Sequence, residues 1–412
     1  MKILYLVHQF YPDSYTGTEK FLLELAKASQ RLGHRVRVVS YSSRPHSFFD
    51  QVDGDLLLKE YSYEGIPVLF VRSQKETENR QQNLGESGLI KTARRILSNE
   101  APDVVHGAHT LGVLDFIYAA REAKIPYLLT LTDFFLLCPK LILMTSSQSL
   151  CAGPEQGSAC RELCPEIVSP IIRKRLVQAG DILRNANCII APSKFLANMF
   201  LKEYGNLKIV EIGYGISYPK IRKNMRRYQQ GDKLTFFYGG SFIRHKGVHI
   251  LIEAFRRVKG NAELKIYGSG QYEYSLRQAA SQDPRIKLCG VFSSDQIGDV
   301  LSQIDVAVVP SIWYENTPII LLESLASNIP VIATDLGGMT EAVNNGINGR
   351  TFRIGNVEEL EEIIDSLINK PETLNTFKDN IKNQFIPSVE QVALAYEKEY
   401  LKACTIAPQY QS

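Results

Sequence analysis

The sequence predicts an α/β protein with two domains, each built on a parallel β-sheet that is covered by helices. At 412 residues the chain is long enough for two domains that each bury a core of their own. Short apolar runs rich in β-branched residues alternate with segments of helical periodicity, and this alternation occurs twice along the chain. A stretch without hydrophobic periodicity separates the two series. Because parallel strands are joined by right-handed crossovers, each series is expected to form its own parallel sheet.

The first series predicts an N-terminal domain over residues 1–212. Its expected strands cover residues 3–7, 36–40, 68–71, 104–106, 127–130 and 188–191. After the first strand, Thr18 is expected to cap a helix whose apolar residues recur at the helical period, and Gly33 is expected to end it. Residues 138–164, which contain four cysteines, are an insertion in this domain.

The second series predicts a C-terminal domain over residues 233–384, and residues 213–232 are the predicted linker. The expected strands of this domain cover residues 234–238, 264–267, 286–288, 306–310 and 331–334. Residues 385–412 are expected to form a last helix and a tail. Ser388 and Gln391 have the spacing of a capping box at the start of that helix.

Two carboxylates lie eight residues apart after the strand 306–310. Pro318 suits the start of a helix, which places Glu315 in the preceding loop and Glu323 within the helix. Ligands of open α/β sheets bind outside the carboxyl ends of the strands, and a helix start offers free N–H groups to a phosphate. The pair therefore suits a ligand with both hydroxyls and phosphates, such as a nucleotide sugar. The alternative is a pair of solvated surface carboxylates, the usual state of glutamate.

With this pair, the chain resembles the retaining glycosyltransferases of family 4, whose signature is two glutamates separated by seven residues. Further motifs extend the resemblance over most of the chain: residues 12–19, 32–36, Gly239-Gly240 with Lys246-Gly247, residues 267–270, Gly337-Gly338 with Glu341, and residues 346–349. The resemblance implies a GT-B fold, in which two Rossmann-like domains face a cleft and a C-terminal helix crosses back to the first domain. It also implies transfer of a sugar from a UDP- or GDP-sugar donor to a hydroxyl acceptor with retention of configuration.

The resemblance also implies roles for single residues. Lys246 would bind the donor diphosphate and offset the charge on the leaving group, so catalysis requires no divalent metal; an exposed first-turn lysine is the alternative. Ser241 stands where the family commonly has an arginine, and Arg244 is the nearest substitute. Glu323 would bind the ribose hydroxyls and Glu315 the hydroxyls of the transferred sugar. The other residues expected at the donor are Gly17, Thr18, Gly268, Asn316, Thr317, Pro318 and Ile319.

Thr132 and Asp133 follow the strand 127–130, where the resembling family usually has a histidine before an acidic residue. Asp133 therefore joins Glu315 and Lys246 as a candidate catalytic residue that contacts the sugar or orients a water. A turn or helix-cap carboxylate is the alternative for Asp133. His106 and His109 are the nearest imidazoles in the sequence, and each is either catalytic or structural.

Four of the seven cysteines, Cys138, Cys151, Cys160 and Cys164, fall within one short segment rich in Ser, Gly and Pro. In a cytosolic chain, clustered thiols favour a metal over disulfides. A structural zinc held by the four thiolates is the simplest interpretation, and an iron–sulfur cluster is the next. Because the spacing contains no CxxC pair, unliganded thiols and disulfides stay open as alternatives.

Composition narrows the class of partner. A net charge of +3, without a basic block interleaved with aromatics, argues against nucleic acid. No apolar run has the about 18 residues of a spanning helix, which predicts a cytoplasmic protein. Basic clusters leave a peripheral contact with an anionic membrane surface open.

The acceptor alternatives are a polysaccharide, a lipid-linked glycan and a small metabolite. The alternative functions are a catalytically silent sugar-nucleotide-binding protein and a GT-B sugar-nucleotide epimerase.

Overall fold

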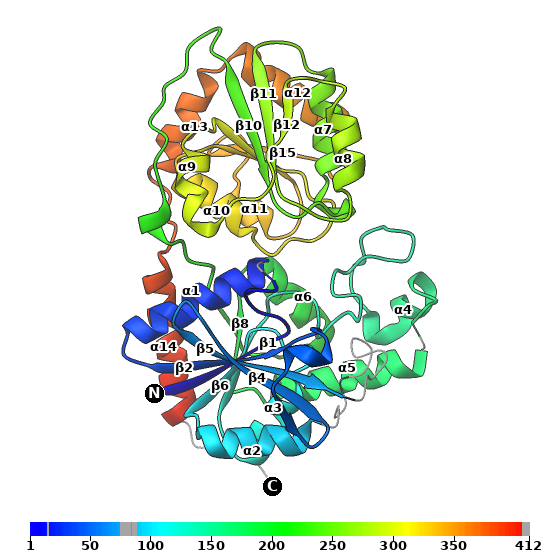
Figure 1. Ribbon diagram of the computed structural model, residues 1–412. Helices are drawn as coiled ribbons and strands as arrows, with labels where there is room; N and C mark the ends of the chain where they lie inside the picture. The colour runs from blue at the N-terminus through cyan, green and yellow to red at the C-terminus, as the bar shows by residue number, and fades with distance from the viewer. Residues whose placement is uncertain (15, 75–83, 85–88, 168, 406–412) are drawn as a thin grey trace. The chain divides into compact units, whose positions relative to one another are not determined.

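The computed structural model describes residues 1–14, 16–74, 84, 89–167 and 169–405. The chain divides into two units (Figure 1). Unit 1 is Met1–Gly215 with Val389–Ser412, and unit 2 is Ile216–Ser388. The predicted tail after residue 405 lies outside the described residues. None of the described helices is long and apolar enough to span a bilayer.

Unit 1 contains a nine-stranded sheet in the order β3-β4-β5-β2-β1-β6-β7-β8-β9. Its strands are β1 Lys2–Val7, β2 Arg35–Tyr41, β3 Gln51–Asp53, β4 Leu56–Tyr63, β5 Ile66–Ser73, β6 Val104–Gly107, β7 Tyr127–Thr130, β8 Cys188–Ala191 and β9 Ile209–Glu211. The strands from β5 to β9 in this order are parallel, whereas β3 and β4 extend one edge as an antiparallel ribbon. The sequence predicted the central strands but missed β3, β4 and β9, which lie at the two edges.

Seven helices are described in unit 1: α1 Gly17–Arg31, α2 Ile90–Glu100, α3 Asp115–Glu122, α4 Ser158–Leu163, α5 Ser169–Arg184, α6 Lys194–Tyr204 and α14 Val389–Thr405. The predicted C-terminal helix is α14, and it returns to unit 1 as expected, where it packs beside α1 (Figure 1). Its Tyr396 and Tyr400 are fully buried. The Tyr400 hydroxyl lies 2.7 Å from Nδ1 of His106, which fixes α14 against the sheet.

Unit 2 contains a six-stranded parallel sheet in the order β12-β11-β10-β13-β14-β15. The strands are β10 Leu234–Gly239, β11 Ala262–Tyr267, β12 Ile286–Leu288, β13 Val306–Val309, β14 Val331–Thr334 and β15 Gly349–Phe352. The helices are α7 Val248–Arg257, α8 Glu273–Ala280, α9 Ile297–Leu301, α10 Ile319–Ala326, α11 Met339–Ala342, α12 Val357–Asn369 and α13 Thr373–Ile381.

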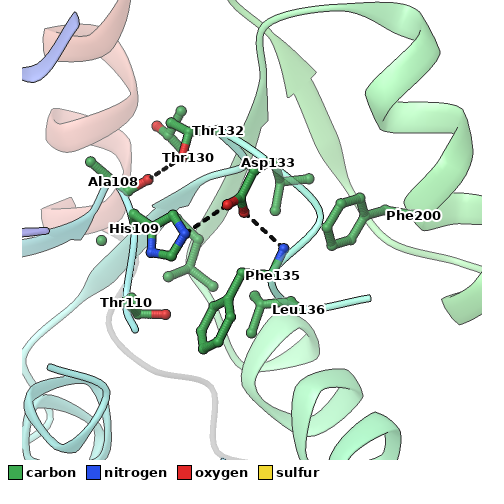
Figure 2. Close-up of a pocket in the computed structure, with 12 residues that line it drawn as sticks. Ala108, His109, Thr110, Thr130, Thr132, Asp133, Phe135, Leu136 and Phe200 are labelled. Carbon is green, nitrogen blue, oxygen red and sulfur yellow. Dashed lines mark hydrogen bonds and ion pairs between the residues drawn. The ribbon is translucent and has the colours of Figure 1, made fainter. Parts of the chain in front are cut away.

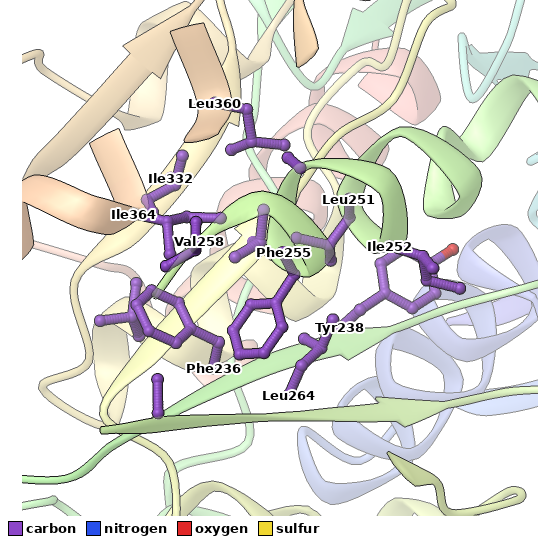
Figure 3. Close-up of a cluster of buried hydrophobic side chains, with 14 of the residues drawn as sticks. Phe236, Tyr238, Leu251, Ile252, Phe255, Val258, Leu264, Ile332, Leu360 and Ile364 are labelled. Carbon is purple, nitrogen blue, oxygen red and sulfur yellow. The ribbon is translucent and has the colours of Figure 1, made fainter. Parts of the chain in front are cut away.

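Successive strand residues point to opposite faces of this sheet, and apolar side chains are buried on both faces. On one face, Phe236 packs with Phe255 of α7 and Ile364 of α12 (Figure 3). On the other face, Phe237 packs in a second cluster with Leu321 of α10. The apolar runs that predicted these strands are explained by this double burial.

The order of the strands creates one switch point in each sheet. In unit 2 the chain builds outward from β10 through β11 and β12, and then continues on the other side from β13. In unit 1 the corresponding neighbours are β1 and β6. At such a point the two crossovers leave in opposite directions, so the loops after the two strands open a crevice at their carboxyl ends.

The segment predicted as a linker, residues 213–232, is largely anchored on unit 2. The amide of Asn224 donates to the carbonyl of Ile304 at 2.6 Å, and the Tyr228 hydroxyl donates to Asp305 at 2.8 Å. The Tyr228 ring also belongs to the core of unit 2. Because polar anchors rather than an apolar period hold this segment, its sequence does not reveal its packing.

Candidate active site

The loop between β13 and α10 carries the first of the two glutamates. Strand β13 ends before Pro310, and α10 begins after Pro318, so Glu315 lies in the loop and Glu323 within α10. Glu315 is 7% exposed and Glu323 is 6% exposed. The pair is therefore buried, and the alternative of two solvated carboxylates is wrong.

Glu315 accepts three hydrogen bonds on a single oxygen. Its Oε1 lies 2.6 Å from Nζ of Lys246, 2.8 Å from Oγ of Ser311 and 2.8 Å from Nε1 of Trp313. Burial by itself would raise the pKa of Glu315, but the Lys246 charge and the three donors hold it below its usual value. Glu315 is therefore an ionised carboxylate at neutral pH, although it is buried.

Lys246 reaches Glu315 from the loop after β10, across the switch point. It ends a short 3₁₀ turn, Arg244–Lys246, and α7 begins only at Val248, so Lys246 lies before the α-helix and not in its first turn. Gly247 joins the two with a φ of +71°, and a Cβ there would lie 1.8 Å from the carbonyl oxygen of Pro310. The N–H of Ile312 donates to the carbonyl of His245 at 2.9 Å. This turn therefore packs directly on the end of β13.

Apart from Gly17 and Thr18, which belong to unit 1, the other residues predicted for the donor belong to unit 2. Asn316, Thr317, Pro318 and Ile319 are half-buried in the loop and at the start of α10. Gly268 serves a turn after β11, where its N–H donates to the carbonyl of Gly290 at 2.7 Å. Arg244 is exposed at the start of the 3₁₀ turn, and the contacts of Glu315 among the described residues do not include it.

Unit 1 brings Asp133 together with a histidine from the neighbouring strand. Asp133 follows β7 and His109 follows β6, and Oδ2 of Asp133 lies 2.7 Å from Nε2 of His109 (Figure 2). The N–H of Phe135 donates to Oδ1 of the same carboxylate at 2.8 Å. Nδ1 of His109 accepts the N–H of Leu111 at 3.3 Å, so the hydrogen-bond network makes Nε2 the donor to Asp133. Asp133 is thus both a turn carboxylate and the partner of an imidazole.

The other candidates beside this pair have structural contacts. The Thr132 hydroxyl donates to the carbonyl of Ala108 at 2.8 Å (Figure 2). His106 is fully buried between Tyr400 and Thr130, each 2.7 Å from one ring nitrogen, and burial lowers its pKa to about 3. His106 is therefore a core histidine, and His109 is the imidazole that faces Asp133.

Two residues that were not predicted from the sequence as site residues, His8 and Glu19, extend the pair of His109 and Asp133 in unit 1. His8, the first residue after β1, lies with its ring centroid 3.9 Å from that of His109. Glu19 of α1 is fully buried, and its Oε1 lies 3.7 Å from Nε2 of His8. Burial, and then the proximity of His109, hold the pKa of His8 well below its usual value, so this imidazole is neutral at pH 7. A signal for His8 existed, because it ends the strand that flanks the switch point.

Glu19 also corrects the predicted start of α1. Its Oε2 accepts the backbone N–H and the hydroxyl of Thr16, at 2.7 and 2.6 Å. Thr16 is therefore the cap and Thr18 is not, because the S/T-x-x-E spacing of a capping box begins at Thr16. Gly17 is the first residue of α1 and is exposed, and Thr18 is half-buried.

The four clustered cysteines are buried and free of disulfides. Among the described residues, no three His, Cys, Asp or Glu side chains are grouped so that they could hold a metal ion. The predicted structural zinc stays a prediction. Burial, and then the proximity of the other three thiols, raise the pKa of Cys160 to about 12, and burial also raises the pKa of Cys138 and Cys151.

Two family models and several known proteins match this chain. The sequence-family model of Glycosyltransferase Family 4 matches residues 15–217, and the sequence-family model of Glycosyl transferases group 1 matches residues 220–384. An uncharacterized glycosyltransferase of Methanocaldococcus jannaschii is 31% identical over 48% of this chain and 54% of its own length. The chain thus aligns with about half of that relative. O-antigen chain mannosyltransferase C of Escherichia coli is 22% identical over 93% of each chain.

Solved structures show the same fold. HepE of Anabaena, in complex with UDP and glucose, has a TM-score of 0.68 with 20% identity, over 97% of this chain and 98% of its own. Sucrose-phosphate synthase of Thermosynechococcus elongatus has a TM-score of 0.72 with 16% identity, over the same shares. At such identities the likeness shows the fold alone. Because two glycosyltransferase family models match residues 15–217 and 220–384, which together make up most of the chain, the chain belongs to the family 4, group 1 glycosyltransferases, with the GT-B fold.

Proposed function

We propose that the protein is a retaining glycosyltransferase that moves a sugar from a UDP- or GDP-sugar to a hydroxyl acceptor. The observation that carries this proposal is the contact of Lys246 with Glu315 at the switch point of unit 2, which pairs a cation with a buried, ionised carboxylate. A diphosphate requires a cation such as Lys246, and sugar hydroxyls suit a carboxylate such as Glu315. HepE, a structure of the same fold, binds UDP and glucose, which supports a nucleotide sugar as the donor.

In the proposed reaction, Lys246 binds the diphosphate and stabilises the charge that develops as the bond from phosphate to the anomeric carbon breaks. Glu315 binds hydroxyls of the transferred sugar, and Glu323 binds the ribose. The acceptor oxygen bonds to the anomeric carbon on the face that the phosphate leaves, and its proton passes to the leaving phosphate oxygen. No divalent metal is required, because Lys246 and the N–H groups at the start of α10 face the negative charge.

On the acceptor side, we assign Asp133 to a hydroxyl of the acceptor or of the sugar. His109 and the N–H of Phe135 fix this carboxylate, and its side chain stays 23% exposed. The family relatives include O-antigen chain mannosyltransferase C and the Staphylococcus aureus capsular polysaccharide biosynthesis glycosyltransferase CapM, so a growing polysaccharide is the favoured acceptor. Such an acceptor fits a cytoplasmic enzyme that works at the inner membrane face.

The test separates the two glutamates. Glu323→Gln is expected to weaken UDP or GDP binding by about tenfold or more, because a hydrogen bond to a charged group contributes about 1.5–3 kcal/mol. Glu315→Ala is expected to lower kcat more than nucleotide affinity. Glu358→Gln, a change to an exposed carboxylate of α12, is the control. Calorimetry with UDP and GDP, turnover with their sugars in the presence of EDTA, and NMR of the product give the readouts.

Transfer at the wild-type rate by both variants would reject this site. A product with inverted configuration would reject retention, and loss of turnover in EDTA would reject the metal-free mechanism. Nucleotide-sugar binding without turnover would favour the silent protein, and interconversion of donor sugars would favour the epimerase.

A further inference from the structure

Trp313 contacts both members of the charged pair in unit 2. It is the only tryptophan in the sequence, and it lies in the loop between β13 and α10. Its Nε1–H donates to Oε1 of Glu315 at 2.8 Å, while Nζ of Lys246 lies 4.9 Å from the centroid of its ring. Its ring centroid also lies 4.7 Å from that of His245. One rigid side chain therefore contacts a cation with its face and an anion with its edge.

We infer that Trp313 is a positioning residue, which holds Lys246 and Glu315 in the arrangement that binds the diphosphate and the sugar of the donor. This inference rests on the proposed function. Lys246 has a flexible four-carbon stem, and its ammonium has no preferred direction of bonding. The indole face attracts that ammonium and so restricts the stem to positions beside Glu315. The indole N–H fixes the carboxylate independently, because it is a donor that no protonation change can remove.

The contacts of Glu315 leave room for the donor sugar. All three side-chain donors converge on Oε1, and among the residues that the structure describes Oε2 has no hydrogen-bond partner. Oε2 therefore keeps its full capacity to accept hydrogen bonds from sugar hydroxyls. Lys246 is 24% exposed at its side chain, so a diphosphate can reach it.

Binding of the diphosphate then gives Trp313 its distinct role. A diphosphate competes with Glu315 for the ammonium of Lys246, and Glu315 loses part of the positive charge that keeps it ionised. The donors that remain on Oε1 are Ser311 and Trp313. Ser311 and Trp313 keep the buried carboxylate of Glu315 ionised while Lys246 binds the leaving diphosphate. The sugar hydroxyls can therefore still donate hydrogen bonds to a charged acceptor.

Two substitutions in the full chain separate the face of the ring from its N–H. Trp313→Phe keeps a ring face for Lys246 and removes the donor to Glu315, whereas Trp313→Leu removes both. For Trp313→Phe we expect UDP affinity within about twofold of wild type and kcat lower by about tenfold or more, because a donor to a charged group is lost. We expect the acid limb of its pH–rate profile to move to higher pH. For Trp313→Leu we also expect UDP affinity to fall about threefold to tenfold, as the cation loses its aromatic partner.

Calorimetry with UDP and with GDP measures affinity, and the fluorescence of the single tryptophan in wild type reports binding beside it. The inference is overturned if calorimetry detects binding while the tryptophan emission is unchanged. It is also overturned if Trp313→Phe keeps the wild-type kcat and pH profile, a result that stands even where Trp313→Leu fails to fold. A wild-type protein that binds neither nucleotide would refute the proposed function and this inference with it. Wild-type binding and transfer with unaffected variants would refute the inference alone.

Discussion

Gly247 determines how the turn that carries Lys246 packs on the end of β13, and Gly247→Ala tests this directly. An alanine at φ +71° costs about 1–2 kcal/mol in the left-handed region. Its Cβ would also lie 1.8 Å from the oxygen and 2.7 Å from the carbon of the Pro310 carbonyl. Both atoms belong to the backbone, so no change of rotamer relieves the contact, and overpacking of this kind adds about 1–3 kcal/mol.

Gly355→Ala is the matched control. Gly355 lies in the same unit with a φ of +70°, and a Cβ there would have no neighbour within 4 Å. The two variants share the cost of the left-handed backbone and differ only in the clash. Gly247→Ala is therefore expected to lose about 1–3 kcal/mol more, or about 2–12 °C in the unfolding temperature of a unit of this size.

The assay is denaturant or thermal unfolding, together with calorimetric binding of UDP. We expect Gly247→Ala to bind UDP at least about tenfold more weakly than Gly355→Ala, because moving the turn separates Lys246 from Glu315. Equal loss of stability in the two variants, with equal UDP affinity, would refute the reasoning. It would mean that the turn shifts away from Pro310 at no cost and that its position does not set the site.

Three further perturbations test other parts of the structure. Lys246→Met leaves Glu315 buried with only the Ser311 and Trp313 donors, so its pKa is expected to rise relative to wild type. In wild type the lowered pKa stabilises the fold above pH 4.5, and this stabilisation is lost as the pH falls. The stability that the variant loses relative to wild type should therefore be largest at neutral pH and shrink toward pH 4.5. A loss of stability that does not vary with pH in thermal unfolding would contradict this. Tyr400→Phe removes the hydroxyl partner of the buried His106 and is expected to cost about 1–3 kcal/mol in urea unfolding, against little change for Tyr61→Phe in an exposed ring. Because burial raises the pKa of Cys138, Cys151 and Cys160, we expect alkylation at pH 8 to modify the exposed Cys289 first. Early modification of the three buried cysteines would contradict this expectation. Metal analysis of the same sample tests the predicted zinc.

Local pattern was enough for the elements that carry the site of unit 2. The apolar run before Pro310 is buried on both faces of its sheet, so its composition alone indicates a parallel strand. The position of Glu315 in the loop and of Glu323 in the helix followed from that strand and from Pro318. The C-terminal helix and the central strands of both sheets were predicted for the same reason, since burial leaves a periodic trace in the sequence.

The partners of these residues were decided only by the tertiary structure. Glu315 and Lys246 are 69 residues apart, and they meet because β10 and β13 are neighbours in the sheet. The contact of His8 with His109 likewise depends on the pairing of β1 with β6. No local pattern encodes which strands lie side by side, because that order is set by how the whole set of apolar faces is buried together. The sequence by itself therefore determined which residues stand at the strand ends, and the fold decided which of them face one another.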